Sequence, residues 1–438
     1  MNRIGIRRED KNLFERRVPL TPEHVGELTG RGIPVTVQPA PRRVFDENAF
    51  RAAGADVDES LDGCEVVMGV KEIPVDRLAR GKTYVFFSHT IKGQPYNMAM
   101  LARLLELGCT LIDYERVVDD QDRRLVFFGR HAGLAGMIDT LWALGQRLAH
   151  VEGLETPLAD LRQAFGYDGL AAAKRAIAAV GAALSQDGVP PAVAPLVCGF
   201  AGYGNVSAGA QEIYDLLEPE EVSPAELASV DPDDRSRCYK VVFREEHLVD
   251  RGDGSPFELQ RYYDHPEAYR PVFAERHLAS LTLLVNCIYW TERYPRLVTL
   301  DDLRALYGEK GRPRLRVIGD ISCDIDGSVE ATVKATEPDR PVFVYDLDRG
   351  AAVDGVAGHG PVIMAVDNLP AELPRDASES FSSALLPLVP ALAAADLEAP
   401  TLASCGLPAP LERAVIVYRG ELAPDYRYLD EHLARQDP

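Results

Sequence analysis

Short apolar segments alternate with amphipathic segments through the first 133 residues. The apolar segments predict strands at residues 3–6, 34–38, 66–70, 84–87 and 110–113, and the periodic segments predict helices at 21–29 and 94–107. Thr21 followed by Pro22 is typical of a helix start, because the hydroxyl caps the first turn and proline fits there. This alternation predicts a largely parallel sheet with both faces covered.

A second unit of the same kind follows a long helix. Residues 133–150 carry apolar side chains at helical spacing, namely Met137, Ile138, Leu141, Trp142, Leu144 and Leu148. Further helices are expected at 170–184, 208–217 and 378–395, and strands at 192–198, 281–288, 316–318 and 342–345. A chain of 438 residues exceeds one ordinary core. The pattern therefore predicts an α/β protein with two Rossmann-like domains.

A strand, a glycine-rich turn and a helix follow one another at residues 192–217. Gly202 permits a tight turn, and Gly204 lets the backbone approach a pyrophosphate at the positive end of the helix. Ser207 takes the third glycine position and is small enough for close packing. This context predicts a dinucleotide site at Gly199, Gly202, Tyr203, Gly204, Asn205, Val206 and Ser207. A plain strand-turn-helix unit is the alternative.

The sequence does not decide which nicotinamide cofactor binds. The acidic residue expected about 20 positions later, which would bind the ribose of NAD, is not evident. At residues 221–226, a serine is compatible with NADP and Glu226 with NAD. Arg235, Arg237 and Lys240 are candidates for contact with a 2′-phosphate. NADPH and NADH therefore both stay open.

Two titratable side chains follow predicted strands of the first unit. Lys71 comes directly after the strand at 66–70, and His89 shortly after the strand at 84–87. Parallel sheets bind ligands at the carboxyl ends of their strands, so both side chains would face one cleft if the strands are neighbours. A desolvated lysine can act as a base, and histidine titrates near neutrality. The pair suits proton transfer to and from an amine; a surface lysine beside a hydrogen-bonded loop histidine is the alternative.

The acidic composition narrows the range of partners. A net charge of −21 argues against nucleic acid, and no segment approaches the roughly 20 apolar residues that span a bilayer. The seven cysteines are scattered without a CxxC pair, which argues against a metal site and for a reducing compartment. Residues 1–12 are charged and unlike a signal peptide. We therefore expect a cytoplasmic protein without a metal or membrane segment; a homo-oligomer stays open.

Basic residues that cluster against this background indicate an anionic substrate. They are Arg7, Arg8, Arg16 and Arg17 near the start, with Arg123 and Arg124 as a second pair. A guanidinium matches a carboxylate with two parallel hydrogen bonds, and we take Arg17 as a substrate ligand on this ground. Solvated surface arginines are the alternative for at least half of the six.

A polar loop follows the predicted strand at 316–318. Its residues Asp320, Ile321, Ser322 and Cys323 would lie near the nicotinamide if the sheet is doubly wound. A turn that the aspartate caps is the alternative.

Taken together, these segments resemble the lysine–2-oxoglutarate reductase half of aminoadipate semialdehyde synthase. They are similar, more distantly, to lysine-forming saccharopine dehydrogenases and to alanine dehydrogenase and transhydrogenase. The resemblance extends over almost the whole chain and rests on REDK at 8–11 with ERR at 15–17, GVKE at 69–72, FFSHTIK at 86–92, IDYE at 112–115, AGLAGMID at 132–139, GNVS at 204–207, GDISCD at 319–324 and AVDNLP at 365–370.

The resemblance implies a reaction in which L-lysine, 2-oxoglutarate and NADPH give saccharopine. Lys71 would be the proton acceptor and His89 the proton donor. Substrate contacts would come from Arg7, Gln94, Glu115, Arg123 and Phe128, and dinucleotide contacts from Tyr203, Gly204 and residues 320–323. It also implies a split first domain, at residues 1–133 plus 346–438, and a dinucleotide-binding domain at 134–345.

Two departures from the family leave alternatives open. The bifunctional proteins continue into a saccharopine-oxidising domain, whereas this sequence stops at Pro438, so we expect a separate protein to oxidise saccharopine. Fungal members use NAD and favour the reverse direction, so direction and cofactor stay open. A different amine substrate is one alternative. A non-catalytic dinucleotide-binding subunit is another, and the intact Lys71 and His89 argue against it.

Overall fold

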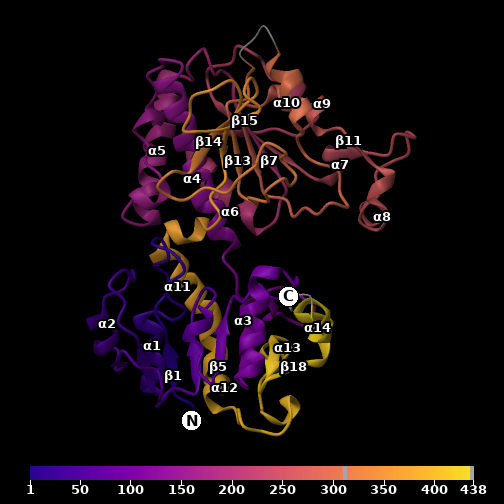
Figure 1. Cartoon of the computed structure of the whole chain (residues 1–438). Helices are drawn as coiled ribbons and strands as arrows, with labels where there is room; N and C mark the ends of the chain where they lie inside the picture. Colours follow the sequence, from indigo (N-terminus) through magenta and orange to yellow (C-terminus); the bar gives the residue numbers. More distant parts are fainter. Residues whose placement is uncertain (309–312, 435–438) are drawn as a thin grey trace. The chain divides into compact units, whose positions relative to one another are not determined.

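The computed structural model describes residues 1–308 and 313–434 (Figure 1). The chain divides into two compact units, one made of residues 1–128 and the segment from 374 onward, and one made of residues 129–373. Each unit has its own eight-stranded sheet, and a small two-stranded sheet lies in the second unit. The predicted α/β class, with two mostly parallel sheets and a discontinuous first domain, is confirmed.

The sheet of the first unit has the order β18-β17-β6-β5-β4-β1-β2-β3. Six strands run parallel, and only the pairs β6–β17 and β17–β18 are antiparallel. The strands are β1 (Ile4–Ile6), β2 (Val35–Val37), β3 (Asp56–Val57), β4 (Val66–Met68), β5 (Thr83–Phe86), β6 (Thr110–Asp113), β17 (Val415–Tyr418) and β18 (Glu421–Leu422). β4 and β5 are therefore neighbours, as the pairing of Lys71 with His89 requires.

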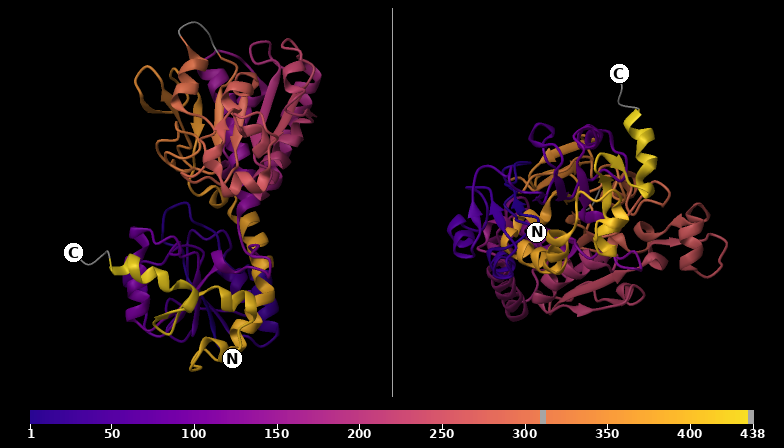
Figure 2. Two further views of the ribbon diagram at one scale, coloured as in Figure 1. Left: turned by 90° about the vertical axis from the view of Figure 1, so that its right-hand side faces the viewer. Right: turned by 90° about the horizontal axis from the view of Figure 1, so that it is seen from below.

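The C-terminal segment completes the first unit. Its helices α11 (Pro374–Leu385) and α12 (Val389–Ala394) contribute Phe381 and Leu392 to the same core as β1 and β5, and β17 pairs with β6. Figure 2 shows this segment against the strands of the first unit. The other helices are α1 (Pro22–Gly30), α2 (Glu47–Ala52), α3 (Pro95–Glu106), α13 (Ala409–Arg413) and α14 (Asp430–Ala434).

The main sheet of the second unit has the order β15-β14-β16-β13-β12-β7-β9-β8. Its strands are β7 (Leu196–Ala201), β8 (Glu220–Glu221), β9 (Cys238–Phe243), β12 (Leu283–Asn286), β13 (Val317–Asp320), β14 (Val342–Asp346), β15 (Ala351–Asp354) and β16 (Val362–Met364). β14 is antiparallel to both β15 and β16. Residues 346–373, which the sequence analysis places in the first domain, lie in the second unit because β15 and β16 pair there.

Helices cover both faces of this sheet. Along β7, Cys198 and Phe200 join one core cluster, whereas Val197 and Ala201 join the other, as expected when side chains alternate between faces. The first cluster includes residues of α4 (Gly129–His150), α5 (Leu170–Asp187) and α6 (Asn205–Tyr214). The second includes residues of α9 (Phe273–Arg276) and α10 (Leu300–Tyr307). After β9, the chain continues through α7 (Glu245–Leu248), β10 (Val249–Asp250), α8 (Leu259–Asp264) and β11 (Arg270–Pro271).

Most predicted elements lie where the sequence pattern places them, and the differences have local causes. β6 has the predicted bounds, and Thr21 caps α1 by accepting a hydrogen bond from the backbone N–H of His24. β7 begins at Leu196 rather than at residue 192, because Pro195 cannot donate to a strand ladder. α6 begins at Asn205, directly after the glycine turn, rather than at residue 208.

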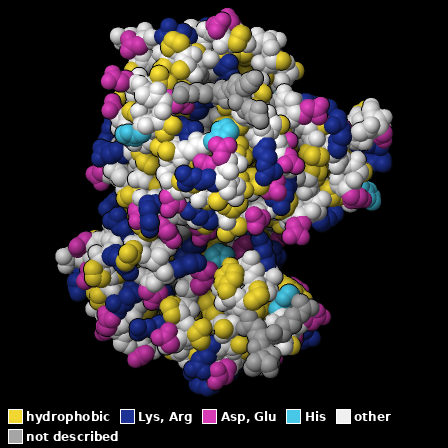
Figure 3. All heavy atoms as spheres, turned by 45° about the horizontal axis from the view of Figure 1, so that its top comes forward, with side chains coloured by type: hydrophobic (Ala, Val, Ile, Leu, Met, Phe, Trp, Pro, Cys, Tyr) yellow, Lys and Arg dark blue, Asp and Glu magenta, His cyan; other side chains and the backbone are white. Residues whose placement is uncertain are grey.

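Charged side chains of both signs are interspersed on the face that Figure 3 shows. Within the described residues of this face, Lys and Arg side chains do not form one extended basic surface. Binding to a phosphate backbone uses such a surface.

Candidate active site and dinucleotide turn

The end of β4 positions Lys71. Glu9, which follows β1, accepts hydrogen bonds from the backbone N–H groups of Val70 at 2.7 Å and Lys71 at 3.0 Å. The preceding residue must be small, because a Cβ at Gly69 would lie 3.2 Å from Oε1 of Glu9 and 3.3 Å from the Arg7 side chain. Burial raises the pKa of Glu9 to about 7, although the charge of Arg7 opposes that shift. The backbone at Lys71 is therefore held by a half-buried carboxyl group.

The amine of Lys71 lies in surroundings that disfavour its protonated form. Burial lowers its pKa, and the charges of Arg17 and Lys11 lower it further, against the opposing charges of Glu72 and Glu15. Among residues 1–308 and 313–434, no hydrogen bond or ion pair to Nζ of Lys71 is found. A lysine that gives up its proton more readily, with no bond to break, is suited to accept a proton from a substrate.

Glu72 joins His89 to Lys11. Nδ1 of His89 lies 2.6 Å from Oε1 of Glu72, and Nζ of Lys11 lies 2.9 Å from Oε2. Burial alone would raise the pKa of Glu72, but its hydrogen bond to His89 and the charges of His89 and Lys11 outweigh burial and lower it to about 2. Glu72 is therefore ionised throughout the neutral range.

The backbone of His89 adopts an unusual conformation. Its φ of +50° lies in the left-handed region that residues other than glycine seldom adopt. The carbonyl of His89 accepts a hydrogen bond from Asn97 at 3.1 Å, and the ring stacks on Phe87 with centroids 6.2 Å apart. In the described part of the chain, Nε2 has no hydrogen-bond partner. Nε2 is thus the nitrogen that a substrate can reach.

Arg17 lies in a fully buried ion pair. It donates to Glu15 through Nε at 2.8 Å and through Nη2 at 2.6 Å, and its guanidinium lies 4.3 Å from the ring centre of Phe128. The structure thus brings two predicted substrate ligands, Arg17 and Phe128, into contact. It also shows that Arg17 already holds a carboxylate of its own.

Glu115 is joined to Arg124 rather than to Arg123. Nη2 of Arg124 donates to Oε1 of Glu115 at 2.5 Å. Arg123, the predicted ligand, has a 74% exposed side chain and pairs with Asp119 at 2.7 Å. Gln94, also predicted, lies just before α3 and accepts a hydrogen bond from the Tyr96 hydroxyl at 2.7 Å.

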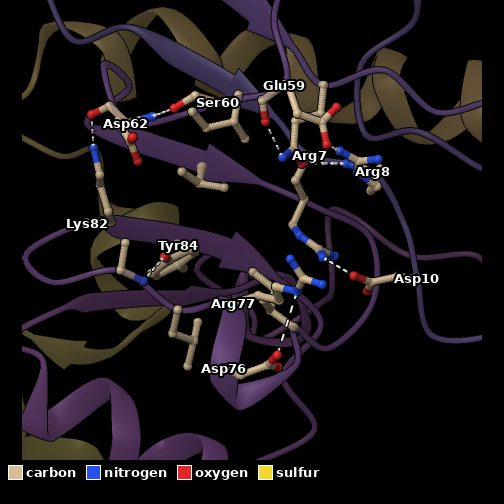
Figure 4. A pocket seen from close by; sticks show the side chains of 16 residues that line it. Arg7, Arg8, Asp10, Glu59, Ser60, Asp62, Asp76, Arg77, Lys82 and Tyr84 are labelled. Carbon is tan, nitrogen blue, oxygen red and sulfur yellow. Dashed lines mark hydrogen bonds and ion pairs between the residues drawn. The ribbon is translucent and has the colours of Figure 1, made fainter.

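Arg7 lines a cavity of about 670 Å³ in the first unit (Figure 4). Its Nη2 donates to Asp10 at 2.8 Å, while the buried Nη1 has no hydrogen-bond partner among the residues that the structure describes. Arg77 and Tyr84 line the same cavity, which Lys71 and His89 do not line. Arg7 thus borders this cavity, and its contact with a substrate stays a prediction.

In the second unit, the glycine turn follows the central strand β7. Gly202 has a φ of +98°, and a Cβ there would lie 3.2 Å from the carbonyl oxygen of Cys287, so glycine is required. A Cβ at Gly204 would meet no heavy atom within 4 Å, which leaves open space before α6. Open space over a turn of backbone N–H groups fits a pyrophosphate.

Close packing of α4 on α6 fixes this turn. A Cβ at Gly133 would lie 1.9 Å from the carbonyl oxygen of Val206, and one at Gly209 would lie 2.1 Å from that of Arg130. The third-glycine position Ser207 is fully buried and accepts a hydrogen bond from Gln211 at 2.9 Å. Small residues on both helices therefore bring the start of α6 to its place beside β7.

The loop after β13 is held by its own hydrogen bonds. Asp320 accepts from Asn286 at 2.8 Å, from Thr332 at 2.5 Å and from the backbone of Cys323 at 3.2 Å. Burial raises the pKa of Asp320 to about 6, although these hydrogen bonds lower it. The side chain of Ser322 donates to the carbonyl of Ile288 at 2.6 Å. These bonds agree with the alternative of a capped turn, and contact of residues 320–323 with the cofactor stays a prediction.

A cavity of about 590 Å³ opens beside the glycine turn. Gly202, Tyr203, Gly204, Arg244 and Glu245 are among the residues that line it. Its volume lies within the usual range for ligand pockets.

The three basic residues predicted to meet a 2′-phosphate are engaged elsewhere. Arg237 pairs with Glu220, and Lys240 pairs with Asp215 at 2.8 Å. Arg235 donates to the carbonyl of Val189 at 2.9 Å. The acidic candidate Glu226 is exposed and bonded to Ser223. Each of these four side chains therefore already has a partner within the protein.

Two family models match the chain. "Alanine dehydrogenase/PNT, N-terminal domain" matches residues 5–135, and "Alanine dehydrogenase/PNT, C-terminal domain" matches residues 275–424, together more than half of the chain. The chain belongs to the alanine dehydrogenase/PNT family. The family resemblance stated from the sequence is thereby confirmed.

Relatives of this alanine dehydrogenase/PNT family member are similar to it over most of its length. Alpha-aminoadipic semialdehyde synthase of Arabidopsis thaliana is 37% identical over 445 residues, covering 97% of this chain and 41% of the relative. The mitochondrial enzyme of that name from Bos taurus is 37% identical over 444 residues, covering 98% and 47%. Saccharopine dehydrogenase (NAD(+), L-lysine-forming) of Neurospora crassa is 29% identical over 397 residues, covering 88% and 89%. The chain thus spans less than half the length of the first two relatives.

Solved structures share the fold of this family member. An L-alanine dehydrogenase has a TM-score of 0.61 at 19% identity, covering 98% of this chain and 99% of that chain. A transhydrogenase from Sinorhizobium meliloti has a TM-score of 0.54 at 15% identity, covering 96% and 100%. Within the described residues of the family member, no helix is long and apolar enough to cross a membrane, and no group of three or more potential ligands is arranged for a metal.

Three carboxylates of this family member escaped the sequence analysis as functional residues. Glu9 holds the Lys71 backbone, Glu72 bonds His89, and Glu15 pairs with Arg17. All three belong to the segments on which the resemblance rests, and each lies within two residues of an assigned or basic residue. That adjacency is a signal present in the sequence, but the contacts of Glu9 and Glu72 with other segments cannot be inferred from it.

Proposed function

We propose that this protein joins L-lysine to 2-oxoglutarate and reduces the product to saccharopine with NADPH. The observation that carries the proposal is the arrangement of Lys71 and the Glu72–His89 pair at the ends of the adjacent strands β4 and β5. The names of the relatives, two aminoadipic semialdehyde synthases and a lysine-forming saccharopine dehydrogenase, support the choice of substrates.

The chemistry needs one proton acceptor and one proton donor. The side-chain ammonium of the substrate lysine must lose a proton before its nitrogen attacks the ketone, and the amine of Lys71, with its lowered pKa, accepts that proton. The carbinolamine then loses its hydroxyl group as water, and His89 donates the proton through Nε2. Glu72 bonds Nδ1 and thereby fixes the orientation of the ring, with Nε2 left for the substrate. The dinucleotide supplies the hydride that reduces the imine carbon.

The substrate ligands follow from charge. We assign the carboxylates of 2-oxoglutarate and of the amino acid to Arg7 and Arg17, with Gln94 and Phe128 lining the pocket and Glu115 binding an ammonium group. In place of Arg123 we propose Arg124, because Arg124 touches Glu115 whereas Arg123 pairs with Asp119. The cytoplasm is the proposed location, and self-association stays a matter for measurement.

The proposal is tested by mixing the purified protein with NADPH, 2-oxoglutarate and one amine at a time while cofactor absorbance is followed. We expect oxidation of NADPH only with L-lysine, together with saccharopine identified by mass. Oxidation with another amine alone would assign the chain to a different substrate. Absence of turnover with every amine, despite tight NADPH binding, would indicate the non-catalytic subunit.

A further inference from the structure

One neighbour of β7 in the sheet, β9, ends beside the glycine turn. β7 and β9 pair in parallel over six residues, ending with Ala201 opposite Phe243, and the N–H of Gly202 donates to the carbonyl of Phe243 at 3.0 Å. In dinucleotide-binding sheets, the residue at the end of this neighbouring strand contacts the adenosine ribose. That residue is Arg244, about 40 positions after the turn instead of about 20. The separation is longer because the short β8 and the segment up to Arg237 lie between the turn and β9.

The guanidinium of Arg244 lies over an aromatic ring and is not ion-paired with any residue that the structure describes. Its guanidinium carbon lies 4.5 Å from the ring centre of Tyr203, the residue between the two turn glycines. In the part of the chain that the structure describes, no ion pair or hydrogen bond engages this guanidinium, although the side chain is exposed. By contrast, Arg237 and Arg270 are both ion-paired, as expected in a chain with a net charge of −21. An exposed, unpaired guanidinium on an aromatic ring is suited to bind an anion.

Glu245, which follows the same strand, is the alternative residue for contact with the ribose. An acidic residue at this position accepts hydrogen bonds from the ribose hydroxyls of NAD. Here the Glu245 carboxylate accepts from the hydroxyl of Tyr263 at 2.8 Å and, more weakly, from that of Tyr203 at 3.5 Å. Both phenols donate to the same oxygen, Oε1 of Glu245, and so hold this carboxylate beside Tyr203 and Tyr263, while the donors of Arg244 remain unused.

We propose that Arg244 binds the 2′-phosphate of NADPH, with Tyr203 fixing its plane, and thereby selects NADPH over NADH. A guanidinium has only donors, which match the oxygens of a phosphate better than a neutral hydroxyl. The inference rests on the dinucleotide role of the turn in the proposed function, and it does not depend on which amine is the substrate.

The test uses the full-length chain and two fragments of the cofactor, adenosine 2′,5′-bisphosphate and 5′-AMP, with affinities measured by calorimetry. We expect the bisphosphate to bind at least about tenfold more tightly than 5′-AMP. Arg244→Ala should weaken bisphosphate binding by roughly 10- to 100-fold, the range for a lost charged hydrogen bond, and change 5′-AMP binding less than about threefold. Arg237→Ala, at the opposite end of β9, should change neither affinity.

Equal affinity of the unaltered chain for both fragments would overturn the inference, as would an equal loss of both in Arg244→Ala. Glu245→Gln tests the alternative: a selective loss of 5′-AMP binding would show that Glu245 reads an unphosphorylated ribose, whereas unchanged affinities support Arg244. Saccharopine formation with NADH and NADPH alike would leave the proposed reaction intact and remove this inference. Selective binding of the bisphosphate without turnover of any amine would support this inference and contradict the proposed reaction.

Discussion

At the level of single residues, the roles of Lys71 and His89 are open to direct test. Lys71→Met removes the proton acceptor and His89→Gln the proton donor, so each should lower turnover by about a hundredfold or more, within the range for general acid–base groups. NADPH binding, followed by fluorescence titration, should stay within about threefold. Lys92→Met, at an exposed lysine that follows β5, is the matched control. Near-normal turnover in both variants would refute the assignment.

Arg123 and Arg124 are adjacent in the sequence but have different contacts. Arg124 bonds Glu115, whereas the exposed Arg123 pairs with Asp119. We expect Arg124→Ala to lower kcat/KM for lysine roughly tenfold, about the effect of one charge-assisted hydrogen bond, because Glu115 loses the contact that positions its carboxylate for the ammonium group. Arg123→Ala should change kcat/KM less than twofold. A larger effect of Arg123→Ala would support the ligand assigned from the sequence instead.

At the level of elements, the glycine turn allows a test that separates folding from binding. Gly204 has an ordinary negative φ of −79°, and a Cβ there meets nothing within 4 Å. Gly204→Ala should therefore leave the melting temperature within about 1–2 °C, since a compatible Gly→Ala change alters stability by less than about 1 kcal/mol. It should weaken NADPH binding at least about tenfold, because the methyl group occupies the approach of the pyrophosphate. Unchanged affinity would favour the plain strand-turn-helix alternative.

The contact of α4 with the short turn Leu369–Glu372 carries a buried carboxyl pair. Asp139 accepts a hydrogen bond from the backbone of Ala164, and Glu372 accepts one from that of Phe165, while the two carboxyl side chains also lie within hydrogen-bonding reach of each other. Burial raises the pKa of Asp139 to about 7 and that of Glu372 well above its usual range. The folded state therefore binds more protons than the unfolded chain between about pH 4 and pH 7.

Stability should consequently fall as pH rises through this window, because the unfolded state gains relative to the folded one wherever it binds fewer protons. We expect the melting temperature to drop by several degrees between pH 5.5 and pH 8.5, at about 2–4 °C per kcal/mol. Glu372→Gln should reduce this dependence, and Glu379→Gln, at an exposed carboxylate, should not. An unchanged pH dependence in Glu372→Gln would show that the pair does not titrate.

The sequence pattern predicts elements better than it predicts their partners. The apolar segment at Thr110–Asp113 and the Thr21 cap are local signals, and the structure has both where they were expected. The strand Cys238–Phe243 was not predicted, because residues 202–237 separate it from β7 and the usual spacing of about 20 positions points to Glu226 rather than to Arg244, the ligand proposed above. The contacts of Glu72 and Arg124 depend on side chains 9 to 61 residues away, which no local pattern encodes.

At the level of the whole molecule, the two units differ in how the chain builds them. The second is continuous, and residues 129–373 contain the clusters that cover both faces of its main sheet. The first needs both ends of the chain, because Phe381, Leu392 and Val417 complete the core formed with residues such as Ile4. β17 also pairs with β6, so removing the C-terminal segment exposes a sheet edge as well as apolar surface.

This difference predicts opposite behaviour for two fragments. Residues 129–373 alone should melt cooperatively and bind NADPH within about threefold of the full chain, because the glycine turn and its supporting helices are all present. Residues 1–128 alone should show no cooperative melting, since they lack core side chains that each stabilise by about 1.5–3 kcal/mol when buried. Joining 1–128 to 374–438 through a short flexible linker should restore a cooperative transition, measured by circular dichroism. Cooperative melting of 1–128 by itself would show that the returning segment is an addition to that unit rather than part of its core.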